Sequence, residues 1–142
     1  MLYFSSYAMG VAGFYSAVNK EPLLGGLLLA SYGTSILHHA NYTNTNYLGG
    51  PWVAWMDRVL ARACWVVSVY KLYPLPLTWR TVISWLAAVS SPLAYFLIIY
   101  TYTKPYRPFV VSKRILLHAC FLHILPSISV VTGMTERRRV LG

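Results

Sequence analysis

Five long apolar runs dominate this sequence and leave few folds open to the chain. Each run is near the roughly 20 residues that a helix needs to cross a bilayer. Polar or proline-containing turns separate them. We therefore predict an all-α, polytopic transmembrane bundle of about five helices, followed by a solvated basic tail at 135–142. The predicted spans are residues 2–18, 22–39, 52–73, 79–102 and 109–133.

The charge content supports a bilayer environment. Charged residues make up 11% of the chain and hydrophobic residues 57%, whereas soluble domains spend about a quarter of their residues on charge. The net charge is +9, but the basic residues stand at the ends of the apolar runs and in Arg137, Arg138 and Arg139. This distribution is typical of interfacial anchors that contact anionic headgroups. We expect membrane lipids as partners, and no nucleic acid.

The first and last runs carry particular features. Ser6, Gly10, Gly13 and Ala17 allow a second helix to approach the first one closely. The first run is also polar enough that an interfacial helix is the alternative for it. In the second run, Gly25, Gly26 and Gly33 indicate close packing or local distortion. Proline interrupts two later runs, at Pro92 and Pro126.

The ionisable residues inside the runs are the candidate functional residues. Such groups are costly in a bilayer and commonly mark functional sites. Ser35 and His39 are four apart, so they share one face of a helix. Because successive spans alternate in direction, His39, Asp57 and His118 all fall toward the same side of the membrane. His123 lies somewhat deeper in the last run.

This order of residues resembles the CREST superfamily of membrane hydrolases, which includes alkaline ceramidases and the progestin and adipoQ receptors. Its members share a Ser-x3-His at the end of one span, an Asp early in the next, and a His pair in the last span. The matching residues are Ser35, His39, Asp57, His118 and His123.

The resemblance implies a catalytic Zn2+ held by His39, His118 and His123, with water in the fourth position. It further implies that Asp57 positions or deprotonates that water. Ser35 would bond the water or the developing oxyanion. The implied activity is hydrolysis of a lipid amide or ester that enters from the membrane, and His38 would be a neighbour rather than a ligand.

The chain departs from the family in two respects. It has five predicted spans instead of seven, a difference that keeps the alternation of sides. His118 and His123 are five apart rather than four, which in a regular helix separates them by about 140°. A π-bulge would bring them onto one face. Pro126, which cannot donate to the carbonyl of Leu122, is a suitable place for such a distortion.

Other interpretations of the same residues stay open. Ser35 can bond its own helix, Asp57 can be solvated at the interface, and His38 and His39 can complement the negative end of a helix. At the level of function, one alternative is a non-catalytic accessory subunit of a larger membrane complex. Another is bis-histidine haem ligation, with Gly33 leaving space for the macrocycle.

Overall fold

The computed structural model describes residues 2–41, 50–102 and 115–141, and all regular structure in these ranges is helical. The last described range is one continuous helix, Ile115–Leu141, with a π-helical segment inside it. The start predicted for it, residue 109, lies outside the described residues. The elements are α1 (Leu2–Val18), α2 (Pro22–Asn41), α3 (Gly50–Leu72), α4 (Trp79–Tyr102), η1 (His118–Ile124) and α6 (Leu125–Leu141).

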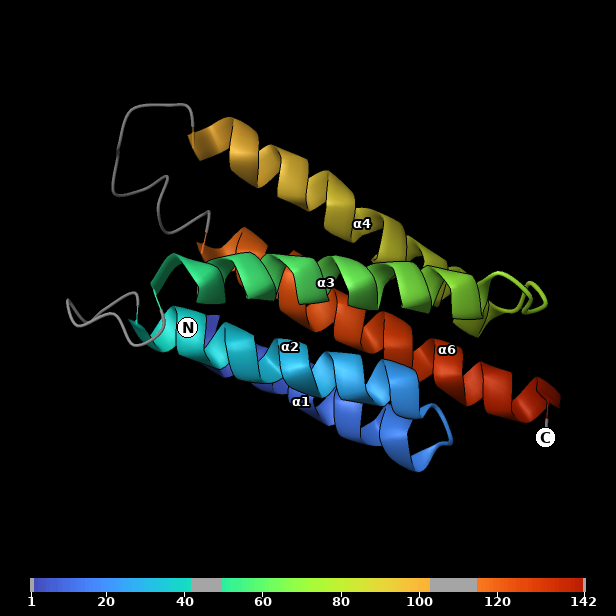
Figure 1. The fold of residues 1–142 in the computed structure, drawn as a ribbon. Coiled ribbons are helices and arrows are strands. Elements are labelled where there is room, and N and C mark those ends of the chain that lie inside the picture. Colours follow the sequence, from blue (N-terminus) through green and yellow to red (C-terminus); the bar gives the residue numbers. More distant parts are fainter. Residues whose placement is uncertain (1, 42–49, 103–114, 142) are drawn as a thin grey trace.

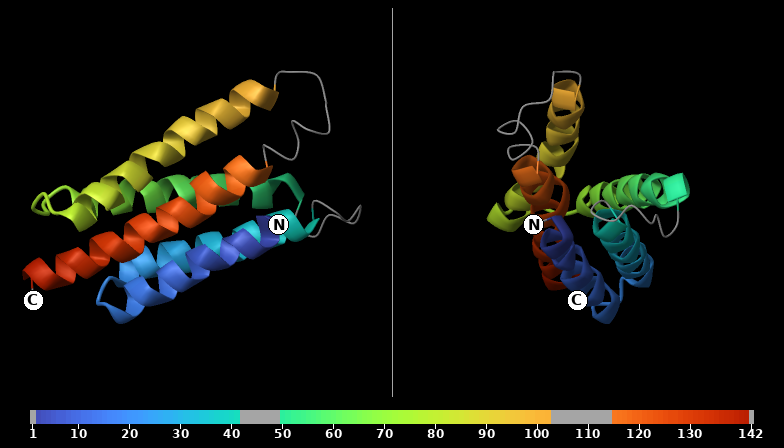
Figure 2. Two further views of the ribbon diagram at one scale, coloured as in Figure 1. Left: turned by 180° about the vertical axis from the view of Figure 1, so that it is seen from behind. Right: turned by 90° about the vertical axis from the view of Figure 1, so that its left-hand side faces the viewer.

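The helices run up and down in alternation, so the end of α2 and the start of α3 lie at the same end of the bundle (Figure 1). The helix formed by η1 and α6 lies at the centre of the bundle (Figure 2). Both of its parts contact α1 and α4, and its α6 part also contacts α3. α4 diverges from its neighbours toward its C-terminal end (Figure 1). The two termini lie at opposite ends of the molecule.

Small residues bring α1 and α2 into close contact, as the sequence predicts. A Cβ added at Gly25 would lie 2.7 Å from the backbone nitrogen of Ala17, and one at Gly13 would lie 3.0 Å from that of Leu29. By contrast, a Cβ at Gly26 or Gly33 would meet nothing within 4 Å. Of the two expectations for these glycines, close packing is confirmed for Gly25 and does not apply to Gly26 and Gly33, for which local distortion stays a prediction.

The interior of the bundle combines an apolar cluster around Leu24, Leu28 and Met134 with many buried hydroxyl groups, and its exterior carries many large apolar side chains. Buried serine and threonine hydroxyls link the helices: Ser129 donates to the carbonyl of Ser84 at 2.7 Å, and Ser91 donates to that of Phe121 at 2.8 Å. Large apolar side chains instead form stripes at helical spacing on the outside. The stripe of α1 comprises Phe4, Tyr7, Val11, Phe14 and Val18, and that of α4 comprises Leu86, Val89, Leu93 and Phe96.

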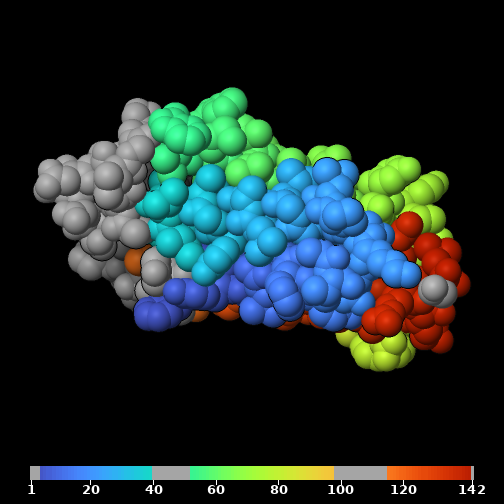
Figure 3. Space-filling model, turned by 60° about the horizontal axis from the view of Figure 1, so that its bottom comes forward, coloured from blue at the N-terminus to red at the C-terminus, as the bar shows by residue number. Residues whose placement is uncertain are grey.

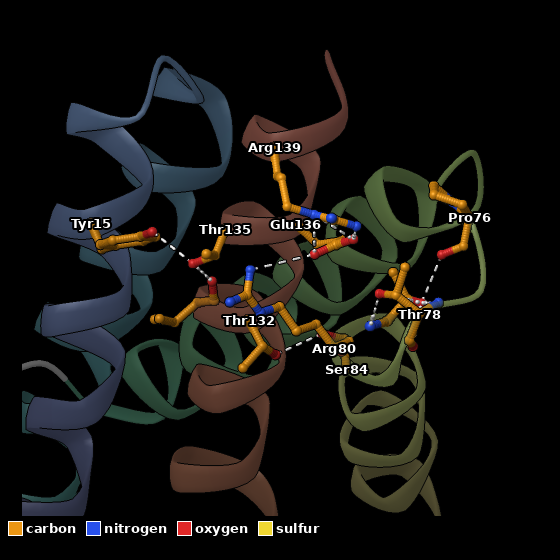
Figure 4. A network of polar contacts seen from close by, with 11 residues as sticks. Tyr15, Pro76, Thr78, Arg80, Ser84, Thr132, Thr135, Glu136 and Arg139 are labelled. Carbon is orange, nitrogen blue, oxygen red and sulfur yellow. Dashed lines mark hydrogen bonds and ion pairs between the residues drawn. The ribbon is translucent and has the colours of Figure 1, made fainter. Parts of the chain in front are cut away.

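The end of the last helix differs from the prediction. We expected the helix to stop at 133 and a solvated tail to begin at 135, but α6 continues to Leu141. Glu136 is 1% exposed and pairs with Arg80 and Arg139 (Figure 4). Tyr15 Oη also bonds Thr135 Oγ1 at 2.8 Å. These contacts hold the last turns of α6 against α1 and α4. The sequence did not indicate this packing, because the high charge of the segment is typical of a solvated tail.

Of the described helices, Ile115–Leu141 is the one that is long and apolar enough to cross a membrane by length and composition. α1 has 17 residues, at the lower limit for a span. α3 carries Asp57, Arg58 and Arg62 within its length. The structure therefore shows a helical bundle with one candidate span.

Candidate metal centre

The predicted ligands meet where the N-terminal part of α1, the end of α2 and η1 come together. His39 lies in the last turn of α2, and His118 and His123 lie in η1. The up-and-down topology places these segments at one end of the bundle (Figure 1). Residues more than 75 positions apart are thus brought into one cluster by the packing of α1 between α2 and η1.

A π-helix aligns the two C-terminal histidines. The N–H of Leu125 donates to the carbonyl of Cys120, five residues back, as a π-turn requires. Pro126 follows directly and has no N–H to give to Leu122, so a regular α-helical ladder would be incomplete here in any case. The wider turn brings residues i and i+5 onto one face. As a result, the ring centroids of His118 and His123 are 4.9 Å apart.

The third ring closes the cluster. The ring centroid of His39 lies 5.2 Å from that of His118 and 5.4 Å from that of His123. One nitrogen from each of the three rings can be chosen so that all three lie within 4.8 Å of one another. Among the described residues, this is the group that could hold a metal ion. The predicted triad is therefore assembled by the fold.

Hydroxyl groups from α1 support His123. Ser5 Oγ lies 2.7 Å from His123 Nδ1, and Ser6 Oγ lies 3.4 Å from the same nitrogen. Ser6 Oγ also bonds Ser35 Oγ at 3.0 Å. With Nδ1 bonded to a serine, Nε2 of His123 is the nitrogen left for a metal. Hydrogen bonds of this kind fix the tautomer and orientation of metal-binding histidines.

His39 shows the opposite situation. Its Nε2 is buried, with no hydrogen-bond partner among the described residues, while the residue is 9% exposed. A buried polar atom without a partner is costly and needs an explanation. A metal ion between the rings would provide one. Three histidines, which leave the fourth coordination position to water, are a donor set suited to catalytic zinc.

The distances agree with a site that closes slightly on binding. Zinc–nitrogen bonds of about 2.0–2.1 Å put the nitrogen atoms of a tetrahedral site about 3.4 Å apart. The nitrogens here lie within 4.8 Å. Side-chain rotations that draw the nitrogens together by up to about 1.4 Å would bring them to this spacing, so the residues present fit the metal.

Asp57, His38 and Ser35 take different positions. Asp57 is half-buried on α3 and is not in the group whose ligand atoms lie within 4.8 Å of each other. The ring of His38 lies tilted against that of His39, with centroids 5.1 Å apart, and is also outside that group. Ser35 is fully buried and bonds Ser6 of α1.

The geometry bears on the haem alternative as well. Axial histidines approach a haem iron from the two faces of a macrocycle. Here the three rings contact each other directly, so no plane between two of them is free for a porphyrin. A Cβ added at Gly33, the residue expected to leave space for the macrocycle, would meet nothing within 4 Å.

The sequence did not indicate Ser5 and Ser6 as members of the site. They precede the histidines by more than 30 residues and share no spacing pattern with them. The available signal was topological, because the start of the first helix falls on the same side as the end of the second. Which of its residues face His123 depends on the rotation of α1, which the packing determines.

Comparisons with protein-family models, with curated protein sequences and with solved structures found no match. The resemblance to the CREST superfamily therefore rests on the order and the chemistry of five residues.

Proposed function

We propose that this chain is an integral membrane, zinc-dependent hydrolase of lipid amides or esters with a CREST-like site. One observation supports it above the others. Three histidines from two distant segments converge at one end of the bundle, around a buried Nε2 of His39 that no described residue bonds.

The membrane part of the proposal is supported by the distribution of side chains. Phe4 and Phe14 on α1 and Leu93 and Phe96 on α4 are more than 60% exposed, while serines make up most of the buried polar residues. This arrangement is unfavourable in water and suits a hydrocarbon solvent, in which small and hydroxyl side chains hold helices together. We infer five spans, with η1 and α6 forming the last one.

Each residue then has a defined task. Bound zinc would polarise a carbonyl group and activate water at neutral pH. Ser5 holds His123 through Nδ1, and Ser35 acts on the same ring through Ser6. The chain has three acidic residues, and Glu21 and Glu136 are engaged in ion pairs at the far end of the bundle. Asp57 is therefore the carboxylate that remains to accept a proton from the attacking water.

A non-catalytic accessory subunit is the second candidate. The divergence of α4 from the bundle favours it, because the outer stripe of that helix would suit a neighbouring subunit as well as lipid (Figure 1). In that case the histidine cluster would have only a structural role.

Metal analysis of detergent-purified protein separates the two candidates. We expect about one zinc per chain in the wild type and its loss in both His39→Ala and His118→Ala. His38→Ala is the matched control, since His38 touches His39 but lies outside the triad. It should retain zinc. A wild-type protein without metal would contradict the hydrolase, and the accessory subunit would become the leading proposal.

Activity is the second measurement. On a fluorogenic lipid amide, Asp57→Asn should retain zinc and lose about 10²–10⁴-fold in rate, the usual contribution of a general base. Equal rates for Asp57→Asn and the wild type would remove Asp57 from the mechanism.

A further inference from the structure

The end of the bundle opposite the histidines carries a strong positive charge. There the α1–α2 turn, the start of α4 and the C-terminal end of α6 lie close together (Figures 1 and 3). Among the described residues, this end has six basic side chains and two carboxylates, Glu21 and Glu136. The basic ones are Lys20, Lys71, Arg80, Arg137, Arg138 and Arg139.

Two of these six cations take no part in the ion pairs between described residues. Glu21 is bonded by Lys71 Nζ at 2.7 Å and by Arg137 Nε at 2.9 Å. Glu136 is likewise shared by Arg80 and Arg139. Within the part of the chain that is described, no ion pair involves Lys20 or Arg138.

Both leftover cations line one groove. It has a volume of about 310 Å³ and lies between the α1–α2 turn and the end of α6. Arg138 is held there by a 3.0 Å bond from Nη1 to Asn19 Oδ1. Glu21 and Arg137, which pair with each other, also line the groove, as do the apolar residues Val18, Met134 and Leu141. The groove therefore offers two exposed positive charges beside an apolar surface.

Its place along the bundle corresponds to a membrane interface. Glu21 precedes α2 and His39 lies near the end of that helix, so about 27 Å of helix separates the groove from the histidines. This is close to the roughly 30 Å of a bilayer hydrocarbon core. If the histidines lie near one leaflet surface, the groove lies at the level of the opposite headgroups.

We propose that this groove binds the phosphate of an anionic phospholipid headgroup, in the leaflet opposite the histidine cluster. The two cations match the phosphate, and the apolar wall matches the glycerol and acyl chain that follow it. A free phosphate ion would leave that wall without a contact. The inference rests on the membrane location proposed above and is independent of zinc.

The test compares lipid retention by variants in neutral detergent. Wild-type protein is titrated with phosphatidylglycerol or phosphatidylcholine of equal chain length, and bound lipid is counted by native mass spectrometry. The variant is Lys20→Gln with Arg138→Gln. The matched control is Arg58→Gln with Arg62→Gln, which removes the same charge from exposed sites on α3.

We expect the wild type to retain phosphatidylglycerol preferentially and the groove variant to bind it about twentyfold more weakly, since each cation near an anionic surface contributes about fivefold. The control should bind as the wild type does, and 10 mM inorganic phosphate should not displace the lipid. Both variants should keep the thermal midpoint and the metal content of the wild type. Lipid binding is measured independently of zinc, so the result can be interpreted even if the zinc proposal fails.

Three results would overturn the proposal. The first is equal retention of the two lipids by the wild type. The second is an equal loss in the groove variant and the control. The third is displacement by inorganic phosphate, or preferential binding of an acidic peptide or RNA, which would assign the groove to another ligand.

Discussion

The contact between Ser5 and His123 shows how a single hydroxyl can decide whether a histidine is ready to bind metal. Ser5 Oγ lies 2.7 Å from Nδ1 of His123, and a hydrogen bond at this atom leaves Nε2 of the ring as the nitrogen for a metal. Removing this partner leaves the ring with the longer, 3.4 Å contact of Ser6 Oγ at the same nitrogen, which holds it less firmly. Ser5 is thus a positioning residue for the proposed site.

We expect Ser5→Ala to weaken zinc binding about 10–100-fold, as the loss of a hydrogen bond to a metal-binding histidine commonly does. Competition with a chromophoric chelator measures this change. Ser5→Thr keeps the hydroxyl and should restore most of the affinity.

Ser16→Ala is the matched control for this substitution. Ser16 is on the same helix, fully buried, and its Oγ has no partner among the described residues. Its substitution should leave zinc affinity unchanged. Equal affinity in Ser5→Ala and the wild type would show that the serine does not position the ring.

At this scale the sequence predicted the three histidines and the need for a π-bulge, and the structure contains a π-helix at that place. This was possible because spacing along one helix determines which residues share a face. It could not predict Ser5 or Ser6, because a bond between helices depends on how each one is rotated. Asp57 stays a prediction, since its spacing does not determine how close it comes to the histidines.

The pairing of α1 with α2 illustrates packing between elements. Gly25 faces the backbone of Ala17, with less than 3 Å for an added Cβ, whereas its neighbour Gly26 faces open space. Successive residues of a helix are 100° apart, and here only one of the two adjacent glycines points at α1. The sequence shows that small residues are present but not which of them is in contact.

We expect Gly25→Ala to destabilise the protein by about 1–3 kcal/mol, because the backbone of α1 would have to move. Gly26→Ala should be neutral or stabilise by up to about 1 kcal/mol, since alanine favours a helix over glycine. Unfolding by a denaturing detergent, followed by circular dichroism, measures both. Similar losses in the two variants would mean that α1 and α2 do not pack as described.

At the scale of the molecule, the helices of the described ranges alternate in direction, and the two ends of the chain lie at opposite ends of the bundle (Figure 2). The alternation was predictable because polar and proline-containing turns separate the apolar runs. The extension of the last helix to Leu141 was not, because it depends on ion pairs with residues on other helices, such as that between Glu136 and Arg80.

If all five helices span the bilayer, reporter tags at the two termini should lie on opposite sides of the membrane. Protease protection of sealed vesicles, with a tag at either end, measures this directly. Tags on the same side would indicate four spans and support the interfacial position considered for residues 2–18.

The π-helix also affects how related sequences can be recognised. A sequence alignment matches residues by position, whereas the face on which a helical residue lies depends on its rotation about the helix axis. The π-helix η1 accommodates one additional residue without changing the direction of the side chains in the flanking turns. An insertion of the kind usually found in loops can therefore persist within the packed centre of a bundle. A chain with one residue fewer at this place could present the same pair of rings from an ordinary α-helix. A sequence motif with a fixed spacing between the two histidines would match one of these chains and miss the other.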